Sequence, residues 1–127
     1  MAHFKAVVVE DDHDLQFLYR LKLEREGFNV VVASNGLEGL KVIKQHMPDI
    51  ILLDLMMPIM SGTEMLTKLR AEDWGNEMRV IILTNVSRDE APQALRFLGV
   101  ERYIVKAHHT PAQVIQIAQD ILGVKQT

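Results

Sequence analysis

The segment from Ile50 to Gly62 reads IILLDLMMPIMSG and contains the features that decide the fold. It begins with four consecutive apolar residues, Ile50–Leu53, and a carboxylate, Asp54, follows at once. An uninterrupted apolar run of this length is typical of a strand buried on both faces, because a strand with one face in water alternates polar and apolar residues. Strands buried on both faces belong to parallel sheets covered by helices. The segment therefore predicts an α/β protein.

Four more runs of this kind occur along the chain and indicate a sheet of five strands. They are Ala6–Val9, Val30–Ala33, Val80–Leu83 and Tyr103–Val105. Between the runs, apolar residues recur at helical spacing. These residues are Leu15, Phe17, Leu18 and Leu21, then Met65, Leu66 and Leu69, then Val114, Ile115, Ala118, Ile121 and Leu122. Because strands that alternate with helices form parallel sheets through right-handed crossovers, we expect five strands and five helices.

Helix start and stop signals fit this alternation. The N-terminal capping pairs are Ser61 with Glu64, Thr110 with Gln113, and Asn35 with Glu38. The glycines that suit a left-handed position after a helix are Gly27, Gly99 and Gly123. Pro111 suits a first helical position, where its missing N–H costs nothing. Pro92 is compatible with the predicted fourth helix only if that helix starts near Asp89 or Glu90.

Composition narrows the class of protein. A length of 127 residues predicts one domain, residues 1–127, and 48% hydrophobic with 24% charged residues excludes a disordered chain. The net charge of −3 argues against a nucleic-acid binder. The absence of cysteine excludes disulfides and fits a reducing compartment. No apolar run is long enough to span a membrane and the N-terminus does not resemble a signal peptide, so we expect a cytoplasmic protein.

Polar side chains follow the predicted strands where the sheet would bind a ligand, beyond the carboxyl ends of its strands. They are Glu10, Asp11 and Asp12 after the first strand, Asp54 after the third, Thr84 after the fourth and Lys106 after the fifth. Two carboxylates about 4 Å apart repel by roughly 4 kcal/mol at an effective dielectric of 20, so such a cluster needs a positive partner. Oxygen ligands of this kind suit Mg²⁺.

A metal ion, the Lys106 ammonium and the Thr84 hydroxyl would together form a receptor for a phosphoryl group. On this reasoning Asp54 is either a metal ligand or a nucleophile, because an aspartate can accept a phosphoryl group as an acyl phosphate.

In these motifs the chain resembles the receiver domains of two-component response regulators. The matching residues are the acidic run Glu10–Asp12, the loop Asp54–Gly62, and Thr84 and Lys106 at spacings that fit the family. The resemblance covers essentially the whole chain and implies a doubly wound (βα)5, flavodoxin-like three-layer sandwich whose parallel five-stranded sheet has the order 2-1-3-4-5. It also implies a signalling switch whose chemistry is limited to its own phosphorylation and slow dephosphorylation.

The resemblance implies a role for each site residue. Asp54 is the phosphoacceptor, which takes a phosphoryl group from a phosphohistidine on a histidine kinase or a histidine phosphotransfer protein. Mg²⁺ is held by Asp54, directly by Asp12, through water by Asp11, and by the carbonyl of Met56. Lys106 pairs with the phosphoryl oxygens. Thr84 and Tyr103 form the switch. They act on the face made by the predicted fourth helix, fifth strand and fifth helix, which contacts an unknown downstream protein. A homodimer through the same face is a possibility that the sequence does not decide.

Each residue also has a structural interpretation. Asp12 could be only a helix cap, Thr84 a strand-end threonine, Lys106 a solvated lysine and Tyr103 a core aromatic. Pro58 and Gly62 are explained by a tight loop that enters a helix.

Two positions depart from the family pattern, and two more are ones that tune loss of the phosphoryl group in the family. Ala107 replaces the usual proline after the lysine, and a cis bond before a non-proline residue costs about 3–4 kcal/mol, so the sequence leaves open whether this bond is cis or trans. Asn85 replaces a very small residue. Met56 and Val86 cannot orient an attacking water by hydrogen bonding, so we expect a phosphorylated form that hydrolyses slowly.

Two other functions can be compared with the sequence through the residues that they require. A phosphohydrolase of the haloacid-dehalogenase type needs a second acid two positions after its nucleophile, where this chain has Met56. A degenerate receiver that binds partners without phosphorylation remains the alternative, because Asn85 and Ala107 depart from the pattern. The chain ends about one turn after the last predicted helix, so we expect no nucleic-acid-binding output domain within it.

Overall fold

The computed structural model describes residues 3–124 and contains one parallel sheet with the strand order β2-β1-β3-β4-β5. The strands are β1 (Lys5–Val9), β2 (Asn29–Ala33), β3 (Ile50–Leu53), β4 (Val80–Thr84) and β5 (Arg102–Val105). The α-helices are α1 (His13–Arg25), α2 (Gly36–His46), α3 (Gly62–Arg70) and α4 (Pro111–Leu122). All five predicted strands and the doubly wound fold with order 2-1-3-4-5 are confirmed.

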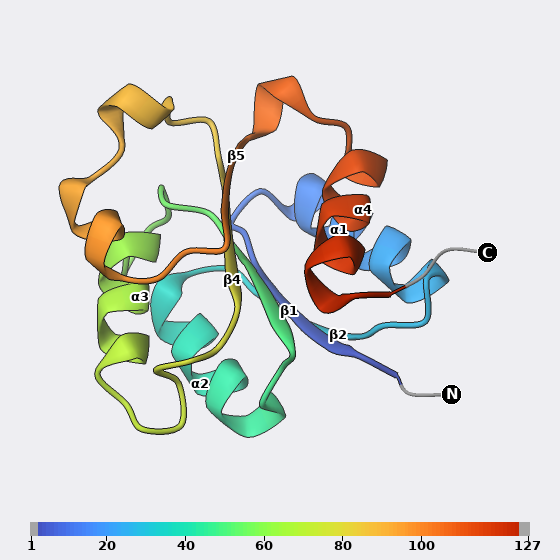
Figure 1. The fold of residues 1–127 in the computed structure, drawn as a ribbon, viewed down its shortest axis with the longest axis horizontal. Coiled ribbons are helices and arrows are strands. Elements are labelled where there is room, and N and C mark those ends of the chain that lie inside the picture. The colour runs from blue at the N-terminus through green and yellow to red at the C-terminus, as the bar shows by residue number, and fades with distance from the viewer. Residues whose placement is uncertain (1–2, 125–127) are drawn as a thin grey trace.

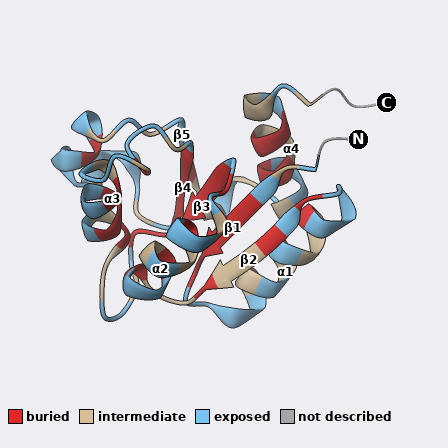
Figure 2. Cartoon of the chain, turned by 90° about the horizontal axis from the view of Figure 1, so that it is seen from below, coloured by how far each residue is buried: buried red, intermediate tan, exposed pale blue. Residues whose placement is uncertain are grey.

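The sheet is the middle of three layers. Helices α1 and α4 cover one face, and α2 and α3 cover the other (Figure 1). Alternate strand residues face the two helical layers, so that Val8 and Leu52 pack with α1 and α4 while Val7 and Leu53 pack with α2 and α3. The central strands are buried along their length (Figure 2), as their apolar runs predict.

Side-chain caps begin the four α-helices. Asp12, Asn35, Ser61 and Thr110 each accept a hydrogen bond from a backbone N–H in the first turn. Thr110 and Gln113 form the full reciprocal capping box, whereas only the Ser61 half is formed at α3. Each cap satisfies an N–H that the helix leaves unpaired, which is typically worth about 1 kcal/mol.

The buried face of α1 differs from the predicted one. Tyr19 and Leu23 are its fully buried side chains, whereas Phe17 is 63% exposed. The aromatic ring of Tyr19 fills the space over β1 together with Val8 and Leu52. The prediction placed Phe17 on the buried face because it counted only apolar residues and left out the ring of a tyrosine.

The predicted fourth helix is wrong. Between β4 and β5 the chain forms two short 3₁₀ segments, η1 (Arg88–Glu90) and η2 (Gln93–Phe97), which lie on the side of α3 (Figure 1). Ala91 separates them with an extended backbone, φ −64° and ψ 143°. The next residue is Pro92, whose ring disfavours a helical conformation for its predecessor. Apolar anchors are also few, because Leu95 is the only buried residue of these two segments.

Among residues 3–124, none of the helices has the length and the apolar character required to cross a membrane.

Candidate functional site

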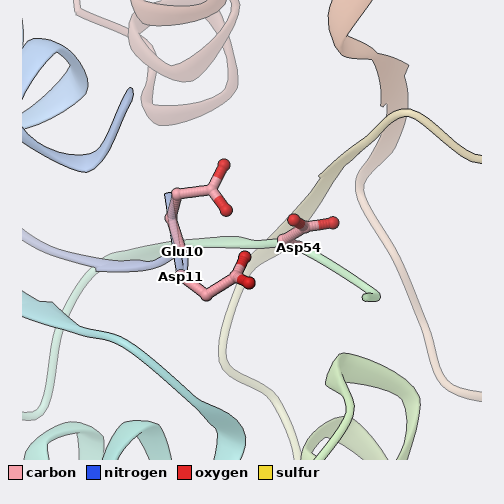
Figure 3. Close-up of side chains that lie close together, drawn as sticks. All are labelled: Glu10, Asp11 and Asp54. Carbon is pink, nitrogen blue, oxygen red and sulfur yellow. The ribbon is translucent and has the colours of Figure 1, made fainter. Parts of the chain in front are cut away.

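Pairing between β1 and β3 brings the acidic residues together at one edge of the sheet. Val9 lies opposite Leu53, and the Asp54 N–H donates to the Val9 carbonyl at 3.1 Å. Glu10 directly follows β1 and Asp54 directly follows β3, so their side chains leave the sheet as neighbours. Figure 3 shows Glu10 and Asp11 at the end of β1 facing Asp54 from the end of β3.

Three carboxylates form the acidic cluster. Glu10, Asp11 and Asp54 each offer an oxygen, and these three oxygens lie within 4.8 Å of one another. Glu10 and Asp54 are only 2% and 6% exposed, whereas Asp11 is exposed. The cluster lines a cavity of about 320 Å³ that opens at the sheet edge. The other residues around this cavity are Asp12, Leu15, Met56, Thr84, Asn85 and Lys106.

Lys106 offsets the negative charge of the cluster. Its Nζ donates to Asp54 Oδ2 at 3.0 Å and also to Glu10 Oε1. The ammonium is mostly shielded from solvent, so these charge-assisted hydrogen bonds act where water screens them weakly. The predicted approach of Lys106 to Asp54 is therefore present.

Burial and charge shift the titration of this pair. Burial disfavours the ionised form of Glu10 and raises its pKa to about 7, and neighbouring Asp54 adds to this effect although Lys106 opposes it. Burial also disfavours the charged form of Lys106, but its hydrogen bonds with Glu10 and Asp54 outweigh this and raise the pKa of the amine above its ordinary value. The ammonium form of Lys106 is therefore stabilised.

Asp12, predicted as the direct metal ligand, lies outside the three-carboxylate cluster. Its Oδ1 accepts hydrogen bonds from the N–H groups of Asp14 (3.0 Å) and Leu15 (3.2 Å), so it caps α1. The structural interpretation of Asp12 thus accounts for its position, although the residue still borders the cavity. The geometry favours Glu10 in its place beside Asp11 and Asp54.

Glu10 was not among the predicted ligands, and the sequence held a signal for it. The Glu10 N–H donates to the Ala33 carbonyl at 2.9 Å, so the backbone continues the strand pairing for one residue beyond β1. Alternation along that extension directs Glu10 inward, whereas Asp12 already occupies the position of a helix cap. Counting the strand alternation onward from Val9 therefore separates the roles of Glu10 and Asp12, which their identical charge does not.

The loop after β3 fits closely around Asp54. A Cβ added to Gly62 would lie 2.1 Å from the Asp54 carbonyl oxygen, so only glycine allows the loop to return this near to the strand. The Met56 N–H donates to Asp54 Oδ1 at 3.3 Å, and the Met56 side chain is 68% exposed at the cavity rim. The structural interpretation of Gly62 and the predicted site therefore describe the same loop.

The predicted switch residues are joined through one residue of the next loop. The Val86 N–H donates to the Thr84 hydroxyl at 3.4 Å, and the Val86 carbonyl accepts from the Tyr103 hydroxyl at 2.6 Å. Thr84 is fully buried and borders the acidic cavity, whereas Tyr103 is half-buried on β5. A shift of the Thr84 hydroxyl toward the cavity would thus disturb the contact that holds Tyr103.

Every peptide bond that the structure describes is trans, which includes Lys106–Ala107, where the sequence left the choice open. Lys106 starts a short 3₁₀ segment, η3 (Lys106–His108), and its amine still reaches Asp54. Ala107 therefore does not prevent the lysine from entering the site. Asn85, the other departure from the family pattern, also borders the cavity.

The acidic cluster has the donor chemistry that Mg²⁺ requires. Mg²⁺ prefers hard oxygen ligands and is usually bound by one or two carboxylates that leave room for water and phosphate oxygens. Glu10, Asp11 and Asp54 supply such oxygens, and the adjoining cavity leaves space for further ligands. The residues present therefore fit this ion.

Comparison with known proteins places this geometry in a family. Residues 6–119 match the model of the response regulator receiver domain. The chain is 32% identical over 120 residues to the polar-differentiation response regulator DivK of Brucella anthropi, covering 94% of this chain and 97% of that protein. It is 35% identical over 115 residues to the phosphate regulon transcriptional regulatory protein PhoB of Rhizobium meliloti, covering 89% of this chain and 50% of that protein.

The fold of the chain also resembles that of a solved structure. The chain aligns with a TM-score of 0.83 and 26% identity to a chain of the CheX–CheY–BeF₃–Mg²⁺ complex of Borrelia burgdorferi, covering 94% of this chain and 89% of that one. The chain belongs to the response regulator receiver domain family and is a receiver domain of two-component signalling. It spans nearly all of DivK but only half the length of PhoB.

Proposed function

We propose that this chain is a phosphorylation-dependent switch in which Asp54 accepts the phosphoryl group. The observation that carries the proposal is the contact of Lys106 Nζ with Asp54 Oδ2 at 3.0 Å inside a cavity bordered by Thr84. A carboxylate in this setting has an ammonium and a hydroxyl beside it, where the charge of a transferred phosphoryl group develops. The structural interpretation of Lys106 as a solvated lysine does not explain this contact.

The donor is a phosphohistidine on a histidine kinase or phosphotransfer protein. An Asp54 oxygen attacks the phosphorus, so that an O–P bond forms while the N–P bond to the imidazole breaks and the freed imidazole nitrogen takes up a proton from solvent. Lys106 holds the negative oxygens, and the Met56 N–H, which donates to Asp54 Oδ1, helps to orient the carboxylate. Mg²⁺ bound by Glu10, Asp11, Asp54 and the Met56 carbonyl would supply further positive charge at the phosphoryl oxygens.

Phosphorylation then acts on Thr84. Its hydroxyl turns to the new phosphoryl oxygens and gives up the contact with the Val86 N–H, which loosens the loop that holds Tyr103. The two-state element is therefore the β4–β5 crossover with β5 and α4, which transmits the change to a downstream protein by direct contact. The same face could also transmit the change by forming a homodimer of two copies of this chain.

Intact mass spectrometry tests the acceptor. We expect one added phosphoryl group after incubation with phosphoramidate and Mg²⁺, none for Asp54→Asn, and none for the native chain in EDTA. Because neither Met56 nor Val86 can orient water by hydrogen bonding, we expect the adduct to outlast a time scale of seconds. If the native chain binds Mg²⁺ but gains no mass, the phosphorylation-independent interaction module replaces this proposal.

A further inference from the structure

A second cavity lies away from the acidic site, along the β4–β5 crossover. Its volume is about 890 Å³, compared with about 320 Å³ at the acidic site. It runs between the 3₁₀ segments and β5, where a regular helix was expected. Three arginines line it: Arg88, Arg96 and Arg102. We call this cavity the arginine groove.

Two of these arginines lack an internal partner. Within residues 3–124, the exposed side chains of Arg96 and Arg102 form neither an ion pair nor a hydrogen bond. Arg88 is used in part, because its guanidinium donates to the Tyr103 carbonyl at 3.1 Å and lies 5.9 Å from the centre of the Tyr103 ring. Unpaired guanidinium groups are suited to bind carboxylates or phosphates in two-pronged contacts.

The rest of the groove indicates a protein partner. Ala91, Pro92 and Leu95 give it an apolar floor, and the aromatic side chain of Tyr103 also lines it. Arginine and aromatic side chains around an apolar centre are enriched in protein interfaces. Nucleic acid is disfavoured because the whole chain carries a net charge of −3 and two carboxylates, Asp89 and Glu101, also line the groove.

We propose that the arginine groove binds an acidic segment of a partner protein, whose carboxylates pair with Arg96 and Arg102 while an apolar side chain packs on Ala91 and Pro92. A second copy of this chain fits less well. In a twofold interface the same surface meets itself, so the surplus positive charge of three arginines over two carboxylates would be doubled rather than offset. A partner segment that carries more carboxylates than basic side chains would neutralise this surplus positive charge.

The groove is also connected to the acidic site. Tyr103 lines the groove, and its hydroxyl donates to the Val86 carbonyl. The Val86 N–H in turn donates to the Thr84 hydroxyl, which borders the acidic cavity. Control of groove binding by phosphorylation therefore rests on the proposed function, whereas recognition of an acidic segment by the unphosphorylated chain does not.

The test uses a fluorescein-labelled 12-residue peptide of alternating Glu and Leu, with a Lys and Leu peptide of the same length as its counterpart. We expect the acidic peptide to bind the unphosphorylated chain and to shift backbone amide resonances of residues 88–103 in ¹⁵N-labelled protein. Arg96→Ala with Arg102→Ala should weaken binding roughly tenfold, because it removes the charge pairs at the interface. Arg20→Ala with Lys41→Ala, on α1 and α2, removes the same charge elsewhere and should leave the affinity nearly unchanged.

Four results would overturn the proposal: equal binding of the Lys peptide, equal weakening by both double variants, resonance shifts outside residues 88–103, or self-association through the groove with no peptide binding. Phosphorylation separates the two proposals. If the peptide binds but beryllofluoride with Mg²⁺ or phosphoramidate leaves its affinity unchanged, binding of an acidic segment is supported. Control of that binding by phosphorylation of Asp54 is then wrong.

Discussion

Two connections leave the central strands at the same edge of the sheet and differ in how firmly they are held. The β3–α3 connection returns so closely that Gly62 has no room for a Cβ, and it ends in a capped helix with Met65, Leu66 and Leu69 buried. The β4–β5 connection has two 3₁₀ segments whose single buried residue is Leu95. The first carries Asp54, the proposed phosphoacceptor, and the second carries the proposed switch and the arginine groove.

The difference has a physical meaning. Phosphoryl transfer requires groups held in a fixed geometry, which the closely packed connection provides. A switch requires two arrangements of similar free energy, and segments with few buried apolar contacts open most easily. In the proposed function, the chemistry and the response are thus divided between two connections of unequal packing.

The largest effect is expected at Gly62. In Gly62→Ala the new methyl group would lie 2.1 Å from the Asp54 carbonyl oxygen, so the loop must move away from the strand. We expect the free energy of unfolding to fall by roughly 3 kcal/mol and the phosphorylation rate to fall with it. Urea denaturation and intact mass spectrometry measure the two effects.

Gly123→Ala is the matched control for that substitution. Gly123 has φ 74° and nothing within 4 Å of an added Cβ, so only the backbone strain of about 1 kcal/mol applies. Equal losses for the two variants would show that the loop around Asp54 is no more tightly packed than a helix end, and the contrast between the two connections would fail.

The next effect concerns the charge held at the ends of β1 and β3. The pKa of Glu10 is about 7 in the folded chain without metal, mainly because of burial, against an ordinary 4.5. Between these pH values the folded state holds more protons than the unfolded state, so the free energy of unfolding contributed by Glu10 falls as pH rises.

Glu10→Gln removes this titration. In EDTA, we expect the variant to gain stability relative to the native chain between pH 4.5 and pH 7, as judged by urea midpoints at both ends of the window. Parallel pH curves for the two proteins would mean that Glu10 is not held in a desolvated position, and that this end of the sheet is less closely packed than its geometry indicates.

A smaller effect is expected in the β4–β5 connection, where Pro92 keeps Ala91 extended. Pro92→Ala restores an N–H and permits a helical backbone at Ala91, so we expect slower amide hydrogen exchange across residues 91–98. In the native chain, amides of residues 88–98 should exchange at least about tenfold faster than those of α3. Equal protection in the native chain would remove the proposed difference in packing.

The sequence predicted the sheet well because strands buried on both faces leave long apolar runs that depend little on context. The helices with capping side chains were also predictable, since Asn35, Ser61 and Thr110 act locally. The fourth helix was not, because Pro92 is compatible with a helix that starts just before it; the extended backbone at Ala91 and the scarcity of buried partners together decide against one. Phe17 was misplaced because the buried face of α1 includes Tyr19, which a count of apolar residues leaves out.

Within the site, residue type and position at strand ends brought Asp54, Thr84 and Lys106 to one cavity. The division among three consecutive acids, Glu10, Asp11 and Asp12, depended on where strand pairing stops and helix capping begins. That boundary is set by the hydrogen bond of the Glu10 N–H with the Ala33 carbonyl, a contact between segments far apart in the chain. Local patterns locate an acidic site but do not assign its members.

The smallest effect is expected at Ile59, which shows that close packing in the β3–α3 connection has a cost. Ile59 has φ 69°, a left-handed conformation that a β-branched residue rarely adopts, and its side chain is 77% exposed. Ile59→Gly relieves this strain and loses little buried surface, so we expect the free energy of unfolding to rise by about 1 kcal/mol. Ile59→Val, which keeps the β-branch, should give no gain. If glycine destabilised the chain in urea denaturation, the exposed isoleucine would be contributing contacts that outweigh its backbone strain, and the loop would owe its shape to that side chain as well as to Gly62.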